Sequence, residues 1–177
     1  MEFVLLGLLG IQPMTIYDMN QSFKSGISLF YSASYGSIQN AVKKLIKKGF
    51  ITFEERIDNG RNKKIYSITP GGQVAYREWM LAPPDLQKLE TVALTKLHFL
   101  GTRTREDRIH ILQGLIDAIE QVEDQLGGLH QQVSAIEVDP SYMDIYRYQV
   151  KTLEYGLMSH GAGKAWFEKL LAAEKDS

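Results

Sequence analysis

Residues 34–70 constrain the fold of this 177-residue chain more than any other stretch. Apolar residues recur there at every third or fourth position, which predicts a helix with one apolar face. They are Ile38, Ala41, Val42, Leu45 and Ile46. Gly49 follows this periodic run and comes directly after Lys47 and Lys48. We therefore expect the helix to end at a glycine cap, with lysines near its negative end.

A charged hairpin is predicted directly after this helix. Two short segments rich in β-branched and aromatic residues, 50–56 and 64–69, flank residues 58–63. The flanked residues contain the turn dipeptide Asn59-Gly60, followed by an arginine, an asparagine and a lysine. This pattern is typical of two antiparallel strands that are joined by a basic tip.

The polar face of the predicted helix carries side chains that can recognise DNA. They are Gln39, Asn40, Lys43, Lys44 and Lys47. Amide side chains can pair with adenine in the major groove, and lysine can reach guanine or phosphate. Such a helix followed by a basic hairpin is the layout of a winged helix-turn-helix. The alternative is a solvated helix face beside an ordinary charged hairpin, because polar faces with lysine are common.

Two further helices are predicted before this stretch. Residues 3–11 are densely apolar and predict a buried helix that Pro13 ends. The segment 15–18, Thr-Ile-Tyr-Asp, fits the capping-box pattern, so a second helix is expected over residues 16–24. Its inward-facing residues should be Ile16, Met19 and Phe23.

Residues with capping roles indicate where the next helices begin. Ser32 or Ser34 is the expected N-cap of the helix with the polar face. Thr69 before Pro70 predicts another helix up to about Leu81. The apolar residues of that helix are Val74, Tyr76 and Trp79. We expect Tyr66 and Tyr76 to lie in the core of the N-terminal domain.

Pro83-Pro84 is the predicted boundary between two domains, because two prolines stop any helix. A helix over residues 91–100 and a long helix over residues 105–136 are expected beyond it. In the long helix, apolar residues recur at every seventh position in two registers, which predicts a coiled-coil-like seam. The seam consists of Leu112, Leu115, Ile119, Val122, Leu126, Leu129, Val133 and Ile136.

The predicted long helix has a consequence for assembly. At 1.5 Å per residue it would be about 48 Å long. A rod of this length cannot bury its seam on a small globule, so we expect the seam to pack against a partner chain as a dimerisation surface. Gly127-Gly128 either weakens the helix or permits a neighbour to approach closely.

A last helix is predicted to begin near Ser141, after Asp139-Pro140, and its continuity through residues 161–163 stays open.

A pocket for an aromatic effector could be lined by Trp79, Trp166 and the tyrosines of the last helix, since flat rings with a polar edge suit such ligands. The alternative is that these aromatic residues pack in the core and at a dimer interface. Trp166 is the candidate effector-binding residue.

Composition excludes several classes of protein. The absence of cysteine excludes a disulfide framework and thiolate chemistry, and it fits a reducing cytoplasm. The apolar run near the N-terminus is too short to span a bilayer. With 44% hydrophobic and 23% charged residues, the chain is expected to form a soluble globule.

The charge is distributed unevenly along the chain. Residues 1–80 contain ten Lys and Arg against six Asp and Glu, whereas residues 81–177 contain ten against fifteen. A basic N-terminal half fits a polyanionic partner, and an acidic C-terminal half does not.

No metal, cofactor or enzymatic chemistry is expected. The four histidines are His98, His110, His130 and His160. They form no i, i+4 pair, and a metal site needs three or four convergent ligands. No Ser/His/Asp arrangement, glycine-rich phosphate loop or pair of catalytic carboxylates is evident.

Several segments together resemble the PadR-type bacterial transcriptional regulators. TIYDMNQSFK, FYSASYGSIQNAVKKLIKKGFI, NKKIYSITPGG and YREWM resemble the N-terminal domain of that family. TKLHFLG, the acidic rod and LEYGLMSHGAGKAWFEKLL resemble the helical dimerisation domain of its subgroup with a long C-terminal region. The resemblance covers most of the chain.

The resemblance implies a mainly α fold with a small β-hairpin wing. Residues 1–81 would form a winged helix-turn-helix, and residues 82–177 an antiparallel helical domain for dimerisation and possible effector sensing. It also implies a homodimeric repressor that binds a palindromic promoter operator. Members of the family sense phenolic acids, aromatic drugs or other signals and some have no known ligand, so a small aromatic effector is one possible partner and the sequence assigns none. The DNA-binding residues would be Tyr17, Tyr35, Ser37, Gln39, Asn40, Lys43, Lys44, Gly60, Arg61, Asn62, Lys63 and Lys64.

A regulator of this kind would act in the bacterial cytoplasm, at the nucleoid. The alternative function is a protein interaction module that uses the heptad rod and does not bind DNA. The dependence of nucleic-acid binding on salt separates the two, because phosphate contacts release counterions.

Overall fold

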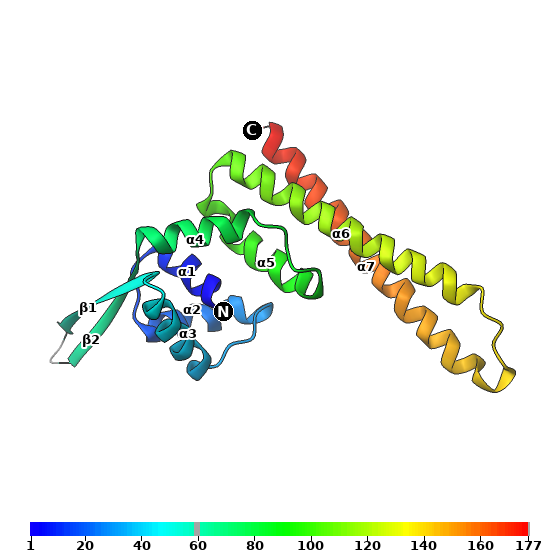
Figure 1. Cartoon of the computed structure of the whole chain (residues 1–177), viewed down its shortest axis with the longest axis horizontal. Coiled ribbons are helices and arrows are strands. Elements are labelled where there is room, and N and C mark those ends of the chain that lie inside the picture. The colour runs from blue at the N-terminus through cyan, green and yellow to red at the C-terminus, as the bar shows by residue number, and fades with distance from the viewer. Residues whose placement is uncertain (59–60, 177) are drawn as a thin grey trace. The chain divides into compact units, whose positions relative to one another are not determined.

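The computed structural model describes residues 1–58 and 61–176, and these form two compact units (Figure 1). One unit comprises Met1–Ala82 together with Glu90–Thr104, and the other comprises Pro83–Leu89 together with the chain from Arg105 onward. The described residues are mainly helical, with one two-stranded antiparallel hairpin, as the sequence predicts.

The core of the first unit is built around α1, Glu2–Ile11. Its leucines and Val4 are buried, and α1 contacts α3, α4 and β2. Helix α2, Ile16–Lys24, begins at the predicted capping box, in which the Asp18 amide donates to Thr15 Oγ1 at 3.2 Å. Met19 and Phe23 face the core as expected, whereas Ile16 is only half-buried. A short 3-10 turn, η1 at Ile27–Leu29, follows.

The helix with the polar face is α3, Tyr35–Lys47. Four of its predicted apolar residues are buried: Ile38, Ala41, Val42 and Leu45. The prediction was wrong for Ile46, which is 36% exposed. Ile46 lies about 100° around the helix from Leu45, at the edge of the apolar face rather than in it. Gly49 has a φ of 70°, which confirms the glycine cap.

The wing consists of β1, Ile51–Asp58, and β2, Arg61–Ile68. The strands are longer than predicted, so Asp58 and residues 61–63 belong to strands and not to a tip. Pairing extends outward because the ladder is formed by backbone groups and needs no apolar side chains. Asn59 and Gly60 lie outside the described residues.

One threonine joins the wing to both neighbouring helices. Thr69 is the N-cap of α4, Pro70–Leu81, and its Oγ1 accepts the Gly72 amide at 3.1 Å. The same hydroxyl donates to the Gly49 carbonyl at 2.7 Å, while the Thr69 amide donates to the Phe50 carbonyl at 3.0 Å. The end of α3, the wing and the start of α4 are thereby fixed to one another.

Helix α4 faces the core with Tyr76 and Met80, which are 2% and 0% exposed. Val74, another apolar residue of this helix, is 58% exposed. Val74 is about 200° around the helix from Tyr76, which places it on the opposite face. Trp79 stacks on Phe3 of α1, with ring centroids 4.9 Å apart and planes 7° apart.

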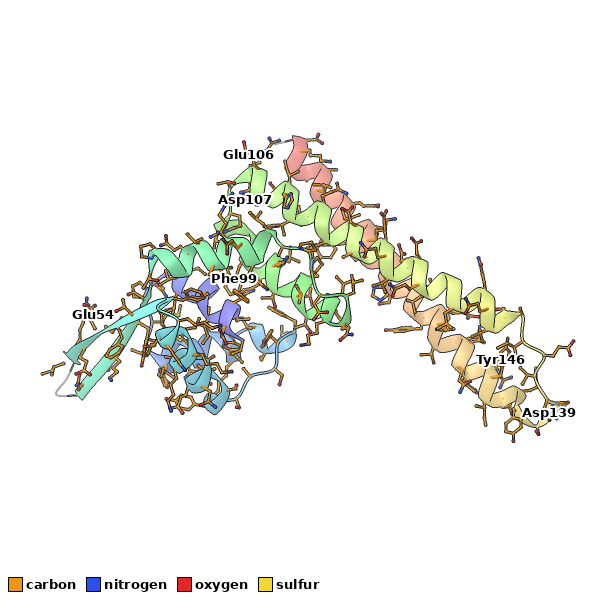
Figure 2. All side chains as sticks on the ribbon, viewed as in Figure 1. Glu54, Phe99, Glu106, Asp107, Asp139 and Tyr146 are labelled. Atoms are coloured by element: carbon orange, nitrogen blue, oxygen red, sulfur yellow. The ribbon has the colours of Figure 1, made fainter. Side chains whose placement is uncertain are left out.

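The first unit also includes most of α5, Leu89–Phe99, which follows the short turn η2, Leu86–Lys88. The Phe99 ring is buried, edge-on to Tyr76 of α4 at 6.3 Å (Figure 2). The ammonium of Lys96 is buried, donates to the Ala82 carbonyl and lies 5.6 Å from the centre of the Trp79 ring. Burial lowers the pKa of Lys96 to about 8. These contacts attach α5 to the winged-helix core, although α5 lies beyond the predicted boundary at Leu81. A functional boundary at that residue stays a prediction.

The turn η3, Leu100–Thr102, follows α5 in the first unit. The second unit is an antiparallel pair of long helices. They are α6, Arg105–Ser134, and α7, Met143–Asp176, with the turn η4 at Pro140–Tyr142 before α7. Helix α6 ends two residues before the predicted Ile136. Tyr146 of α7 points toward α6, where its hydroxyl donates to the Val133 carbonyl at 3.1 Å (Figure 2). At the other end, Arg108 of α6 is 2.9 Å from Glu174 of α7.

The heptad seam is therefore packed partly within its own chain, since α7 lies along α6. Leu112, Leu115 and Ile119 are buried in the monomer. The expectation that only a partner chain could cover the seam did not consider a second long helix of the same chain. Val122, Leu126 and Val133 are half-buried, while Leu129 and Ile136 are 45% and 58% exposed.

Helix α7 is continuous through residues 161–163. An ideal Cβ on Gly156 would lie 3.2 Å from the Leu126 side chain, so this glycine permits the close approach of the two helices. The same construction at Gly127 and Gly128 meets no atom within 4 Å. Among the described residues, no helix is both long enough and apolar enough to cross a membrane.

Gly72 offers a test of the junction between the wing and α4. A Cβ at this position would lie 2.0 Å from the Phe50 carbonyl oxygen. Because that oxygen belongs to the backbone, we expect Gly72→Ala to lower the free energy of unfolding by about 3 kcal/mol in urea titrations.

Gly71→Ala is the matched control, because a Cβ there meets only Thr69 Oγ1, at 3.8 Å. We expect it to be neutral or to stabilise the protein by up to about 1 kcal/mol. Equal effects of the two substitutions would contradict the close packing at Gly72.

Candidate nucleic-acid interface

The outward face of α3 presents four long polar side chains. Its opposite face is buried, so the phase of the helix is fixed by the core. Four of the predicted DNA-binding residues are exposed there: Gln39, Asn40, Lys43 and Lys44. A helix that projects amides and ammonium groups from one side can lie in a major groove and donate hydrogen bonds to base edges and phosphates.

Three elements place further predicted residues around one cleft beside α3. Tyr17 comes from α2, Tyr35 from the first turn of α3, and Lys63 and Lys64 from β2. The cleft has a volume of about 500 Å³ and is also lined by Thr15, Ile16, Asp18 and Tyr66. Two exposed phenols and two ammonium groups at one concave surface can donate hydrogen bonds to the phosphates of a nucleic-acid backbone.

Tyr17 and Tyr35 are both exposed, by 62% and 48%. Gln21, one turn further along α2, donates from Nε2 to the Tyr17 hydroxyl at 2.7 Å. This hydrogen bond orients the Tyr17 ring and leaves the phenolic hydrogen able to donate outward.

The wing side of the cleft is organised by Glu55 of β1. Its carboxylate accepts from Asn62 Nδ2 at 3.0 Å and lies 3.4 Å from the Lys64 ammonium. The hydrogen bond from Asn62 and the charge of Lys64 hold the pKa of Glu55 below its usual value. The Lys64 ammonium also lies 4.3 Å from the centre of the Phe53 ring. Glu55 therefore stays ionised and orients the two wing residues.

Ser37 has a structural function that the sequence interpretation did not assign to it. Its hydroxyl donates to the Ser34 carbonyl at 2.7 Å and accepts the Ser34 amide at 2.9 Å. The Ser37 amide donates to Ser34 Oγ at 3.1 Å, which completes a capping box and makes Ser34 the N-cap. A contact of Ser37 with DNA stays a prediction, and it would have to share this hydroxyl.

Two predicted wing residues cannot be placed in the cleft. Gly60 lies outside the described residues. The backbone of Arg61 pairs with that of Asp58, and its side chain also lies outside the described part.

Tyr66 lines the cleft although the sequence interpretation assigned it only to the core. It is 6% exposed, and burial raises the pKa of its phenol. The alternation of side chains along a strand is the signal that could have found it, because Tyr66 and Lys64 are two residues apart and share a face.

The other candidate residues lie in the second unit. Trp166 is 52% exposed, and its ring meets Phe167 edge-on at 5.2 Å. Within residues 1–58 and 61–176, no three His, Asp or Glu side chains are grouped so that they could hold a metal ion.

Comparison with known proteins shows which family the part of the chain with this interface resembles. Residues 5–78 match the sequence model of the transcriptional regulator PadR-like family. This part of the chain, which contains α3 and the wing, is similar to that family of transcriptional regulators.

Individual relatives match over almost the whole length. The negative transcriptional regulator PadR of Bacillus subtilis (strain 168) is 25% identical over 176 residues, which is 97% of this chain and 96% of that protein. The crystal structure of Bacillus subtilis PadR in complex with operator DNA has 26% identity, a TM-score of 0.47, and coverage of 97% and 96%. The structure of the same regulator in complex with p-coumaric acid has 24% identity, a TM-score of 0.43, and coverage of 99% and 96%.

The cap of α3 provides a test that separates the two serines proposed as N-caps. We expect Ser34→Ala to lower the free energy of unfolding by about 1 kcal/mol, because the Ser37 amide loses its acceptor. Ser32→Ala, at an exposed position, should leave it unchanged. Urea denaturation followed by circular dichroism measures both, and a larger effect at Ser32 would contradict the assignment.

Proposed function

We propose that this protein is a sequence-specific DNA-binding transcriptional regulator, which acts as a homodimeric repressor on a palindromic promoter operator. The observation that carries the proposal is the exposed polar face of α3 beside the cleft that Tyr17, Tyr35, Lys63 and Lys64 line. This arrangement lies in the segment that is similar to the PadR-like family. The Bacillus subtilis relative is a negative transcriptional regulator, which supports repression as the activity.

In this proposal, α3 occupies the major groove and the wing holds the flanking backbone. Asn40 and Gln39 would read base edges, and Lys43 and Lys44 would contact guanine or phosphate. The cleft would take a backbone phosphate between the phenols of the helices and the ammonium groups of β2. The Asn62–Glu55–Lys64 network would keep the wing side chains extended toward DNA.

A dimer would present two such surfaces to the two halves of an operator. Recognition helices on one face of a duplex must lie about 34 Å apart, one helical turn, to enter successive major grooves. Bound in this way, the dimer would exclude other proteins from the promoter.

The outer face of α7 is the surface that we assign to the second copy of the chain. Tyr148, Tyr155 and Trp166 are separated by seven and eleven residues, so they share one side of the helix. They are 66%, 67% and 52% exposed, and the half-buried part of the α6 seam lies in the same helical pair. Large aromatic residues in an uncovered row are characteristic of protein interfaces.

The proposal also includes a small-molecule effector that binds to the second unit. The structure of the Bacillus subtilis relative with p-coumaric acid supports a small aromatic acid as the ligand class. Trp166 is the candidate contact because a flat ring with a polar edge suits such a ligand, and its ring meets Phe167 edge-on. Binding of such a ligand would change the spacing or tilt of the two DNA-binding units.

The alternative function is a protein interaction module that uses the helical rod. The exposed aromatic row on α7 is the observation that favours it. The two functions differ in their response to salt, because only phosphate contacts release condensed counterions.

Gel shifts test the assignment of α3. On DNA from upstream of its own gene, or on duplexes selected from a random pool, we expect tight binding that resists nonspecific competitor and weakens with salt. Asn40→Ala should weaken operator binding by about 1–3 kcal/mol, because one bidentate base contact is lost. Lys43→Ala should also reduce the slope of log affinity against log salt by about one.

Both variants should keep the unfolding free energy of the wild type, since the two side chains are exposed. Unchanged affinity in both would refute the role of α3. Wild-type protein that shows no salt-weakened specific shift on any selected duplex would instead favour the interaction module.

Sedimentation tests the assignment of α7. We expect the wild type to sediment as a dimer and Tyr155→Glu to sediment as a monomer, because the substitution would bury an unpaired charge. Gln121→Glu, on the exposed side of α6, is the control and should remain dimeric. A dimeric Tyr155→Glu variant would show that the copies meet elsewhere.

A further inference from the structure

Gln21 is a residue of the first unit to which the proposed function assigns no role. It lies on α2, one helical turn after Tyr17, and its side chain is exposed. Its Nε2 donates to the Tyr17 hydroxyl at 2.7 Å. Tyr17 lines the cleft beside α3, whereas Gln21 is not among the described residues that line it. Gln21 can therefore act on the cleft through Tyr17.

The stability of α2 does not account for this hydrogen bond. Both side chains are exposed, and a pair of side chains four residues apart on a helix surface contributes little to helix stability. The start of α2 is fixed separately, by the capping box of Thr15 and Asp18. What the hydrogen bond changes is the direction and the strength of the donor that Tyr17 offers to the cleft.

The direction follows from the chemistry of the hydroxyl. A phenol has one hydrogen to donate and lone pairs that accept, so the donation from Gln21 leaves the hydrogen of Tyr17 available. Asp18 also lines the cleft, but its Oδ2 already accepts the amide of Thr15 at 3.0 Å and the hydroxyl of Thr15 at 2.7 Å. That carboxylate is satisfied by the helix cap, and the hydrogen of Tyr17 is left for a ligand.

Phosphate is the acceptor that this arrangement fits. Hydrogen bonds in a chain polarise one another, so a hydroxyl that accepts from an amide becomes a better donor. A hydrogen bond from such a hydroxyl to an anionic oxygen is charge-assisted. Lys63 and Lys64 line the same cleft, and their ammonium groups attract the same anion. A chain from Gln21 through Tyr17 to a phosphate oxygen combines these effects.

We propose that Gln21 is a positioning residue for operator binding, which holds the Tyr17 hydroxyl as a donor to one backbone phosphate of each half-site. This inference rests on the proposed DNA-binding function. A side chain that is fixed before binding loses less conformational entropy when it binds. Gln21 therefore raises the affinity for the operator without selecting its sequence, because a phosphate carries no base identity.

Gln21→Met tests the role of the amide. Methionine has a similar length and helix propensity but no N–H donor. In gel shifts, we expect operator affinity to fall about threefold per half-site, and thus about tenfold for a dimer, because the side chain of Tyr17 must then be immobilised on binding. The slope of log affinity against log salt should not change, since glutamine and methionine carry no charge. The free energy of unfolding in urea should also stay that of the wild type.

A double-mutant cycle with Tyr17→Phe separates positioning from direct contact. Tyr17→Phe by itself should weaken operator binding, because the donor is lost. In the Tyr17→Phe background, Gln21→Met should have no further effect. A loss of the same size in both backgrounds would show that Gln21 contacts DNA by itself, which would overturn the inference. Unchanged affinity of either single variant would overturn it as well.

Gln21→Glu tests the direction of the hydrogen bond. An ionised carboxylate can only accept, so it would draw the hydrogen of Tyr17 away from the phosphate. We expect a larger loss of affinity than in Gln21→Met. The repulsion between the new carboxylate and DNA is measured by the same substitution in the Tyr17→Phe background, where the loss should be smaller. Equal losses with and without the Tyr17 hydroxyl would refute the assigned direction.

Gln73→Met is the matched control, because Gln73 is an exposed glutamine on α4 of the same unit. It should bind the operator as the wild type does, and a loss equal to that of Gln21→Met would contradict a specific role for Gln21. In every outcome that overturns the inference, the wild type still binds its operator. Failure of the proposed function would instead abolish specific binding by the wild type itself.

Discussion

The burial of one face of α3 is the constraint on which the DNA-binding unit depends. Ile38, Val42 and Leu45 are each at most 1% exposed and pack in a core that α1 fills with leucines. Removing such side chains from water is worth about 1.5–3 kcal/mol each, so the helix cannot rotate about its axis. The polar face must therefore point outward, and the positions of Asn40 and Lys43 follow from the packing of the buried residues on the opposite face.

The position of the wing relative to α3 depends on a second constraint, at the junction around Thr69. One hydroxyl accepts from the start of α4 and donates to Gly49 at the end of α3. Gly72 allows α4 to approach the Phe50 carbonyl, which a larger residue would prevent. Because these contacts join both ends of the hairpin, the lysines of β2 and the tyrosines of α2 and α3 meet at one cleft.

The second unit is stabilised in a different way, because its two helices are long enough to pack against each other along most of their length. Two long antiparallel helices bury much of the heptad seam between residues of one chain, and Gly156 lets them approach closely. The aromatic row on the other side of α7 stays in water. One face of the helical pair thus stabilises the monomer, and the other is available for assembly.

Much of the first unit could be predicted from sequence because its signals are local. The capping box at Thr15, the glycine after α3 and the Thr69-Pro70 start of α4 each involve residues a few positions apart. The exposed residues of α3 could be predicted for the same reason, since helical periodicity assigns each residue to a face. Local periodicity failed at Ile46, which lies at the edge of the apolar face and is left outside the core.

The sequence by itself determined the helices, the hairpin, the polar face of α3 and the resemblance to a family, because each depends on the identity and spacing of residues close together in the chain. Only the tertiary structure decided that α7 lies along the seam of α6, that α5 joins the winged-helix core, and that Tyr17, Tyr35, Lys63 and Lys64 line one cleft. Those outcomes depend on which of several apolar faces pack together. That choice is made by the shape and volume of surfaces far apart in the chain, which local spacing does not encode.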